Sequence, residues 1–292
     1  MVQRTPPAPA PRLAVISVSY GSEDVLEGFF NSLRDATAAS PIVVITDNKP
    51  AEGAQVEALA NANAANYLPL DYNHGYGFAV NAAVQTLPPD VEWLLISNPD
   101  LTFAPGSIDA LIRTGDSDSR IGSVGPAIRS TDGQIYPSAR AVPSLRMGIG
   151  HALFANMWTE NPWSRAYKSS QKQTVRRDAG WLSGACILVR RSTYDLLGGF
   201  DAGYFMYFED VDLGYRIGKL GFRNVYEPMA QVTHMGAHST TEDSNRMIRV
   251  HHDSARRFLS KKYSGWLLWP LRAMLSVGLA MRSRIHSRHP RG

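Results

Sequence analysis

Residues 13–20 read LAVISVSY, an apolar run that is rich in β-branched side chains. Such a run, flanked by polar residues, is typical of a strand that is buried on both faces of a sheet. The pattern returns in IVVIT at 42–46 and VEWLLIS at 91–97, with a shorter candidate at 66–70. Because the segments between these strands predict helices, we expect an α/β fold with a mostly parallel sheet.

The helices are predicted from apolar periodicity and from turn residues. In residues 24–36, four side chains recur on one helical face, namely Leu26, Phe29, Phe30 and Leu33. Further helices are expected at 54–62, from the motif at 73–81 to about residue 87, from Pro105 to about residue 114, and at 244–262.

The second half of the chain is less regular. We expect strands at GSVGPAI and at 183–189, then a short helix, and a pair of strands within 222–234 that is broken by a proline and ends at His234. DGQIYPSAR and residues 158–175 predict loops, and small polar residues predict a mobile loop at 235–246.

Polar residues stand where three predicted strands end: Tyr20, Asp47 and Asp100. In open sheets of this kind, ligands bind beyond the carboxyl ends of the strands. We therefore expect these side chains to meet at one binding crevice. A dinucleotide site is excluded, because Gly21 is followed by Ser22, Glu23 and Asp24 in place of G-x-G-x-x-G, and two acids there would repel a pyrophosphate.

Three carboxylates follow an aromatic run in FMYFEDVDLGYR, residues 205–216. Leu213, Ile217 and Leu220 recur with helical spacing, so Glu209, Asp210 and Asp212 lie at a helix start, where the macrodipole favours negative charge. A carboxylate beside aromatic walls is a candidate general base. The alternative is an acidic first turn in which Asp212 pairs with Arg216.

Three other motifs carry candidate site residues. Asn98 and Asp100 in SNPD have the spacing that holds a divalent cation and a diphosphate, or they form a strand-end turn. Asn73 to Gly77 could bring backbone N–H groups to a phosphate, or form a tight turn before a helix. His234 is either a ligand or a structural histidine.

Charge is concentrated at the carboxyl end. The 292 residues carry 30 Lys or Arg and 26 Asp or Glu, and residues 251–292 hold nine of the bases and one acid. The remaining 21 bases and 25 acids give a net charge of −4. A basic tail favours an anionic surface, either membrane or nucleic acid.

Within that tail, residues 263–281 are apolar but interrupted by Pro270 and Arg272, and aromatic residues cluster at one end. This pattern fits a helix lying in the interface of an anionic membrane, or a packing or dimerising helix. The single cysteine, Cys186, excludes an intrachain disulfide and multi-cysteine zinc sites. We find no run of about 20 apolar residues that would span a bilayer.

Together these segments resemble the inverting glycosyltransferase family 2, of GT-A fold, and within it the bacterial rhamnosyltransferases. The resemblance is carried, in the family's order from about residue 13 to 240, by VISVSYGSEDVL, VVITDNKP, NHGYGFAVN, LLISNPDL, WLSGACILVRRS, GGFDAGYFMYFEDVDLGYRIGKLGF and VTHMGAHST.

The resemblance implies a role for each matching position. Asp210 would be the catalytic base with Glu209 as its partner, Asp100 and His234 would bind Mg²⁺ or Mn²⁺, and Trp181 and Gly184 would lie beneath the acceptor. Donor contacts are implied for Tyr20, Asp47, Gly75, Asn81 and Asn98. Asn98 departs from the family's D-x-D, so its direct contact with the metal is an open question.

The implied domains are a disordered lead-in at 1–12, a GT-A domain at 13–243 and a basic, membrane-proximal helical segment at 244–292. The implied reaction is the metal-dependent inverting transfer of L-rhamnose from dTDP-rhamnose to a lipid-linked cell-envelope acceptor. The enzyme would lie on the inner face of the bacterial plasma membrane, without nucleic acid, and a homo-oligomer is compatible with it. Alternatives are a UDP-hexose or UDP-galactofuranose transferase, and an idle scaffold that binds nucleotide sugars.

Overall fold

The computed structural model describes residues 12–144, 174–236, 244–266 and 269–270. The helices are α1 (Glu23–Ala36), η1 (Pro50–Glu52), α2 (Ala54–Ala62), α3 (Tyr76–Gln85), α4 (Ser107–Asp116), α7 (Arg191–Leu196), α8 (Glu209–Lys219) and α9 (Ser244–Lys262). The strands are β1 (Leu13–Ser19), β2 (Ile42–Asp47), β3 (Asn66–Pro69), β4 (Trp93–Ser97), β5 (Leu101–Phe103), β6 (Ile121–Ser130), β7 (Ile135–Tyr136), β8 (Ala139–Arg140), β9 (Arg177–Ala179), β10 (Trp181–Leu182), β11 (Cys186–Arg190) and β12 (Arg223–His234).

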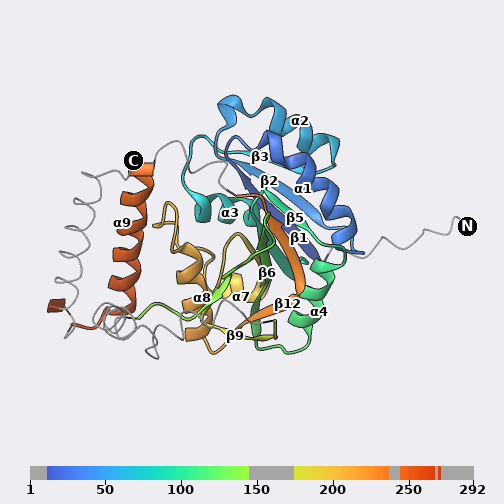
Figure 1. The fold of residues 1–292 in the computed structure, drawn as a ribbon. Helices are drawn as coiled ribbons and strands as arrows, with labels where there is room; N and C mark the ends of the chain where they lie inside the picture. Colours follow the sequence, from blue (N-terminus) through green and yellow to red (C-terminus); the bar gives the residue numbers. More distant parts are fainter. Residues whose placement is uncertain (1–11, 145–173, 237–243, 267–268, 271–292) are drawn as a thin grey trace, which may run out of the picture.

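A large mixed sheet runs through the molecule in the order β3-β2-β1-β4-β11-β6-β12-β5 (Figure 1). The first four strands are parallel, as predicted, because each is joined to the next by a helix. β11 lies antiparallel between β4 and β6, and β5 lies antiparallel to β12 at the edge. β8 and β10 form a separate two-stranded ribbon.

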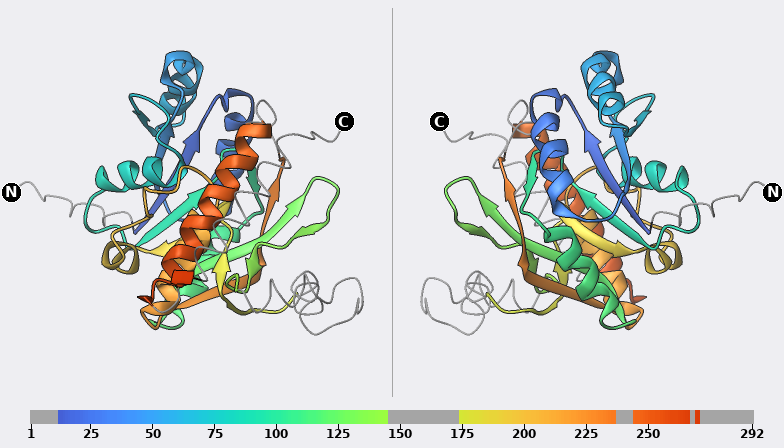
Figure 2. Two further views of the ribbon diagram at one scale, coloured as in Figure 1. Left: turned by 90° about the vertical axis from the view of Figure 1, so that its left-hand side faces the viewer. Right: turned by 90° about the vertical axis from the view of Figure 1, so that its right-hand side faces the viewer.

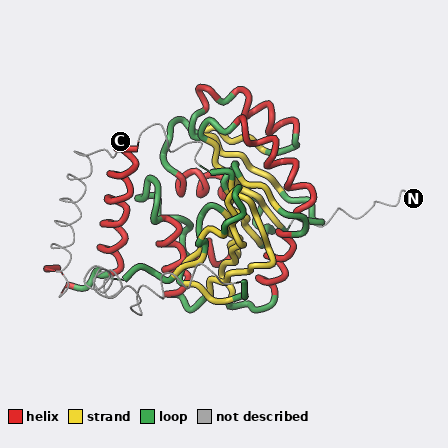
Figure 3. The backbone as a smooth tube through the Cα atoms, in the orientation of Figure 1, coloured by secondary structure: helices red, strands yellow, loops and turns green. Residues whose placement is uncertain are grey.

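Helices cover both faces of this sheet, which explains why the first strand is apolar at every position (Figure 3). On one face Leu13 and Val15 of β1 pack in a core with residues of α1, α2 and α4. On the other face Ala14 and Ile16 pack with residues of α3, α7 and α8. The alternation of β1 side chains between two cores is the expected signature of a central strand.

The helix α9 adds a further layer beyond α8 (Figure 2). Its fully buried Phe258 packs with Val211 of α8 and with Tyr204. The bounds of α9 and α2 agree with the predicted helices at 244–262 and 54–62. In the described part of α9, the helix is thus packed against the body that carries α8.

The predicted pair of strands within 222–234 is in fact one strand, β12, with a register shift between Glu227 and Gln231. Pro228 lies inside this irregularity, where a missing N–H costs no ladder hydrogen bond. Beyond it, His234 pairs in register with Leu101 of β5 and with Ser130 of β6. The bulge therefore lets one continuous strand carry His234 to the edge where β4 ends.

Several predicted segments lie outside the described residues: 1–11 of the lead-in, 158–173, most of the loop at 235–246, and most of the tail after residue 266. In the part of the chain that is described, no helix has the length and apolar character needed to cross a membrane.

Candidate active site

Three of the predicted site residues share one edge of the sheet. β2, β1 and β4 are adjacent and parallel, with Ser19 opposite Asp47 and Ser17 opposite Ser97. Tyr20, Asp47 and Asp100 follow or end these strands, so they lie at the same carboxyl edge, as the strand order requires.

Asp100 and His234 meet at this edge from opposite ends of the chain. Nε2 of His234 lies 3.1 Å from Oδ1 of Asp100 and 3.4 Å from Nδ2 of Asn98. The two side chains are largely buried, with 11% of Asp100 and 28% of His234 exposed. Oδ1 of Asp100 is buried and accepts no well-aligned hydrogen bond among the described residues; its near polar neighbour is Nε2 of His234.

A carboxylate and an imidazole that converge in this way fit a divalent cation such as Mn²⁺. The Asp100 oxygen supports the fit, because a buried carboxylate oxygen requires partners and its contact with His234 is not a well-aligned hydrogen bond. Within the described ranges no group of three His, Cys, Asp or Glu could hold a metal. A cation here would therefore take its other ligands from water and from phosphate oxygens of a substrate.

A short series of contacts joins this pair to the acidic helix α8. The backbone N–H of Asn98 donates to Ala185 O at 2.8 Å. The next residue back, Gly184, donates its N–H to Oδ2 of Asp210 at 2.9 Å. Asp100 and Asp210 are 110 residues apart in sequence, yet the loop at 184–185 touches the segments that carry both.

Asp210 and Glu209 form a buried acidic pair at the start of α8. Burial raises the pKa of Asp210, while N–H donation from Gly184 and Val211 opposes this rise. Burial, followed by the charge of Asp210, raises the pKa of Glu209 to about 8. Since Oε2 of Glu209 has no hydrogen-bond partner among the described residues, we assign the shared proton to Glu209 and the charge to Asp210.

The third acid of this turn has the structural role that the sequence left open. Oδ2 of Asp212 accepts a hydrogen bond from Nε of Arg216 at 2.6 Å, which is the predicted i,i+4 pair. Its other oxygen lies 2.6 Å from Nζ of Lys261 in α9. The structure therefore shows the predicted pair of Asp212 with Arg216, while the role of general base stays a prediction for Asp210.

The glycine motif before α3 packs against the turn before α8. Gly75 has φ +97°, and a Cβ there would lie 2.1 Å from the carbonyl oxygen of Phe205. The N–H of Tyr76 donates to that same oxygen at 3.0 Å, and its hydroxyl donates to Gly184 O at 2.9 Å. Gly75 thus permits a close backbone contact that brings Tyr76 to the loop at 184–185, which in turn contacts Asp210.

Asn81 is occupied by protein partners. Its Nδ2 donates to Phe200 O at 2.9 Å, and its Oδ1 accepts from Tyr194 Oη at 2.5 Å and from Phe200 N at 3.0 Å. These bonds tie α3 to the turn after α7. The donor contact predicted for Asn81 stays a prediction, and the geometry gives it a scaffolding role.

Asp47 is fully buried, and both of its carboxylate oxygens accept hydrogen bonds, from Lys49 N at 2.8 Å and from Tyr67 Oη at 2.8 Å. Tyr20 is 39% exposed, with the Lys49 ammonium 5.7 Å from its ring centroid. Tyr20 can offer a ring to a nucleoside, whereas both oxygens of Asp47 already accept hydrogen bonds from the protein; both donor contacts stay predictions.

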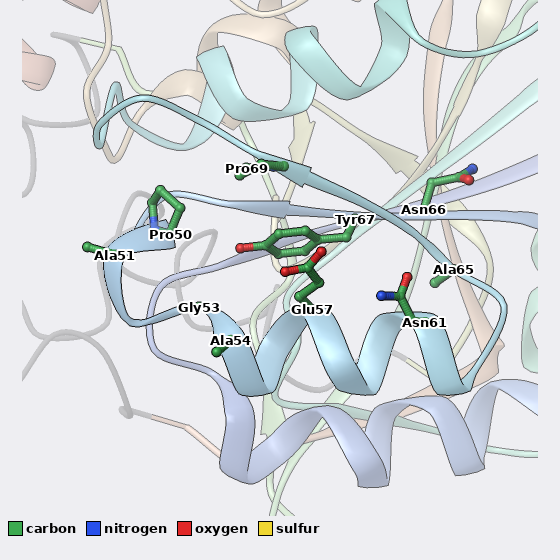
Figure 4. Close-up of a pocket in the computed structure, with 10 residues that line it drawn as sticks. All are labelled: Pro50, Ala51, Gly53, Ala54, Glu57, Asn61, Ala65, Asn66, Tyr67 and Pro69. Atoms are coloured by element: carbon green, nitrogen blue, oxygen red, sulfur yellow. The ribbon is translucent and has the colours of Figure 1, made fainter.

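A cavity of about 580 Å³ lies between α2 and β3, with Tyr67 among the residues that line it (Figure 4). Glu57, Asn61 and Asn66 line it, and none of Asp100, Asp210 and His234 does. Its one charged lining residue is acidic, so this cavity does not suit a diphosphate.

The residues predicted beneath the acceptor lie beside Asp210. A Cβ on Gly184 would approach Asp210 Cβ to 3.3 Å, so the loop and the acid are in close contact. Trp181 packs against Gly214 of α8, and its indole N–H donates to Ala141 O at 3.1 Å. Both positions lie near the proposed base, and their contact with an acceptor stays a prediction.

Sequence reasoning missed residues whose importance depends on tertiary contacts. Tyr76 stands inside a motif that was interpreted through its two glycines and an asparagine, and Arg140 stands in a segment predicted as a loop. Tyr207 and Phe208 adopt left-handed backbone conformations, with φ of 66° and 65°. No local pattern predicts two such residues in succession, although both belong to the aromatic run that precedes the acids.

Chemically, the arrangement joins a candidate cation site to a buried carboxylate with a raised pKa. A raised pKa makes Asp210 a stronger base than an ordinary aspartate, and the neutral neighbour keeps a second charge out of the pair. With a cation held by Asp100 and His234, such a site could bind an anionic leaving group, and Asp210 could remove a proton from a hydroxyl.

Comparisons with known proteins agree with this chemistry. The chain is 43% identical over 282 residues to the N-acetylglucosaminyl-diphospho-decaprenol L-rhamnosyltransferase of Mycobacterium tuberculosis, covering 94% of this chain and 92% of that protein. It is 28% identical over 258 residues to rhamnosyltransferase WbbL of Escherichia coli, covering 85% and 92%.

The fold is also found in a solved structure, the mannosyltransferase PcManGT from Pyrobaculum calidifontis in complex with GDP-Man and Mn²⁺. The TM-score is 0.59 at 14% identity, over 91% of this chain and 69% of that one. Residues 7–251 match the family described as glycosyltransferase like family 2. The chain therefore belongs to glycosyltransferase family 2 and is a glycosyltransferase of GT-A fold.

Proposed function

We propose that the enzyme transfers L-rhamnose from dTDP-rhamnose to a hydroxyl of a sugar that is linked through a diphosphate to a polyprenyl lipid. The observation that carries the proposal is the contact series from Asp210 through Gly184 and Ala185 to Asn98, next to Asp100. It puts a base and a candidate cation site within one small region. The 43% identical relative is an N-acetylglucosaminyl-diphospho-decaprenol L-rhamnosyltransferase, which supports rhamnose and the lipid-linked acceptor.

On the donor side, Asp100 and His234 would hold Mg²⁺ or Mn²⁺. When bound, the cation would neutralise negative charge on the departing nucleoside diphosphate. Asp100 offers a buried oxygen that accepts no well-aligned hydrogen bond among the described residues, and Tyr20 offers an exposed ring at the same edge. Asn98 is neutral, and its amide lies against His234, so it would orient that ring.

On the acceptor side, Asp210 would remove the proton from the attacking hydroxyl. Gly184 N–H fixes one of its oxygens, and Glu209 stays neutral at pH 7 because burial raises its pKa to about 8. The acceptor oxygen then attacks the anomeric carbon from the face opposite the leaving diphosphate. One such displacement inverts the configuration and requires no enzyme nucleophile, which agrees with the burial of Cys186.

The lipid carrier implies a membrane-side enzyme. We infer that it works peripherally on the inner face of the plasma membrane, because the proposed acceptor is carried on a lipid. The basic tail supports an anionic surface as the partner.

The test is the variant Asp210→Asn, which removes the base and keeps the side-chain size. We expect transfer to a GlcNAc-diphosphate-prenyl acceptor to fall by 10²-fold or more, on the order expected for general base catalysis. Binding of dTDP with Mn²⁺, measured by calorimetry, should stay within about twofold of wild type. Turnover that is unchanged in this variant would remove Asp210 as the base.

Donor identity is tested separately on the wild-type enzyme. A panel of dTDP-rhamnose, UDP-glucose and UDP-galactofuranose, each with Mn²⁺, is compared by thermal shift and by product formation. Preference for dTDP-rhamnose supports the proposal, and preference for either UDP sugar replaces it with the alternative transferase. For the Asp210→Asn test, the matched acid-to-amide control for folding is Asp116→Asn. Asp116 lies at the opposite end of the sheet, beside Trp93.

A further inference from the structure

Arg140 lies beside the acceptor side of the site, and the proposed proton transfer and displacement assign it no role. It is the second residue of β8, where it pairs in register with Trp181 of β10. The segment that follows runs beside α8, since Trp181 donates to Ala141 O and packs on Gly214. On the other side, Ser183 N–H donates to Ser138 O, one residue before the Gly184 that holds Asp210.

The guanidinium of Arg140 is held in place by two aromatic rings. Its central carbon lies 5.6 Å from the ring centroid of Tyr136 and 5.7 Å from that of Trp181. Nε donates to Pro137 O at 2.8 Å, which orients the planar group. Among the described residues its two terminal nitrogens have no hydrogen-bond partner, so they are available to an anion.

The charge of Arg140 is felt at Asp210, where it lowers the pKa of the carboxyl group against the effect of burial. No carboxylate is paired with Arg140 in the described ranges. A half-buried arginine that is oriented, stacked and unpaired beside a catalytic acid is suited to a phosphate, which takes two parallel hydrogen bonds from a guanidinium.

We propose that Arg140 binds the phosphate attached to the acceptor sugar, with Trp181 as the surface on which that sugar rests. The inference rests on the proposed function, because it requires an acceptor linked through a diphosphate. Asp210 would face the sugar's hydroxyl while Arg140 holds the phosphate on the same sugar. A single acceptor residue would thus be fixed at both ends, and a diphosphate-linked sugar would be selected over a neutral glycoside.

The experiment compares two acceptors at saturating donor: GlcNAc-diphosphate-farnesyl and a neutral GlcNAc alkyl glycoside. For Arg140→Gln we expect kcat/KM for the diphosphate acceptor to fall about 10- to 100-fold, the contribution of a charge-assisted hydrogen bond. The value for the neutral glycoside and KM for dTDP-rhamnose should stay within about threefold. Arg140→Lys, which keeps the charge without the fork, should lie between.

The matched control is Arg190→Gln. Arg190 also stacks on a tryptophan, 4.3 Å from the Trp93 ring, but lies at the opposite end of β11 from the loop at 184–185. It should leave the ratio between the two acceptors unchanged. Equal losses of Arg140→Gln on both acceptors, or a raised KM for the donor, would overturn the inference. If the wild type uses no diphosphate acceptor at all, the proposed function fails instead.

Discussion

At the scale of single residues, the three acids of one helical turn are in three different states. Asp212 is 1% exposed and neutralised by Arg216 and Lys261. Asp210 has backbone N–H donors, and Glu209 has a buried oxygen without a hydrogen-bond partner in the described region. The macrodipole favours charge on all of them, but burial outweighs it at Glu209, because a charge inside the protein needs its own partners.

Glu209 should therefore make stability depend on pH. In the folded chain its pKa is about 8, and its ordinary value is 4.5. Between these values the unfolded chain loses a proton that the folded chain keeps, so the free energy of unfolding falls as pH rises. Glu209→Gln cannot ionise, and we expect its stability relative to wild type to increase from pH 5 to pH 8, by at most about 1.4 kcal/mol per pH unit.

Urea unfolding at four pH values across that window measures the difference. Glu209→Asp is the control, because it keeps an ionisable group at the same place and should follow the wild-type trend. Parallel curves for wild type and Glu209→Gln would show that Glu209 is already ionised in the folded protein, and the assignment of the proton to it would be wrong.

At the scale of elements, α9 holds the turn that leads into α8. Tyr207 and Phe208 are in the left-handed region, which costs about 1–2 kcal/mol for each non-glycine residue. α9 contributes the compensating contacts: His251 meets both rings, Phe258 packs on Phe208, and Ser254 Oγ donates to Met206 O at 2.8 Å. The strained turn ends at Glu209 and Asp210, so α9 positions the acids indirectly.

Phe258→Ala should separate the contribution of α9 to stability from its contribution to the position of the acids. Phe258 is fully buried, and we expect a loss of about 3–5 kcal/mol in the free energy of unfolding, as for other large-to-small core changes. Since the turn loses its support, kcat should fall at temperatures where the variant is still folded, while dTDP affinity measured by calorimetry stays near wild type.

Arg249→Ala is the control on the same helix, because Arg249 is exposed and should change neither quantity. Retention of the wild-type kcat by folded Phe258→Ala would mean that the turn keeps its conformation without α9. Phe258→Leu, which keeps much of the apolar volume, provides a second variant if the alanine protein does not fold.

At the scale of the whole molecule, local patterns predicted the α/β architecture well. α2 and α9 match their predicted bounds, and β1 differs from its prediction only at Tyr20. The short strands β5, β7, β8, β9 and β10 were missed, because two or three residues carry no periodicity and form strands only through their partners. The Pro228 break proved to be a bulge, because sheet pairing on both sides continues the strand.

Only part of the candidate site could be predicted from the sequence. Strand-end polarity placed Asp100 and Tyr20 at one edge, since adjacent parallel strands end together. The support for Asp210 was not predictable, because Gly184 N–H, Tyr76 and α9 come from segments with no local signal of contact. Arg140 was missed for the same reason: its surroundings are built by the pairing of β8 with β10.

The charge distribution of the whole chain leads to the membrane prediction. Outside residues 251–292 the net charge is −4, so attraction to an anionic surface must come from the tail. Trp266 and Trp269, next to α9, are 79% and 63% exposed, and indole rings favour the interface of a bilayer. Four of the nine tail bases lie in α9, which also supports the turn before α8, and the exposed tryptophans follow shortly after this helix.

We expect the full chain to sediment with vesicles that contain phosphatidylglycerol, and to do so less as salt rises, because screening weakens attraction between charged surfaces. Replacing Trp266 and Trp269 by Ser should reduce binding several-fold, and removing residues 263–292 should reduce it further. Met229→Ser is the matched control, since Met229 is 78% exposed but lies on β12. If the truncated chain bound these vesicles as well as the full chain, or if phosphatidylcholine vesicles bound the full chain equally, the tail would be a packing segment with no membrane role.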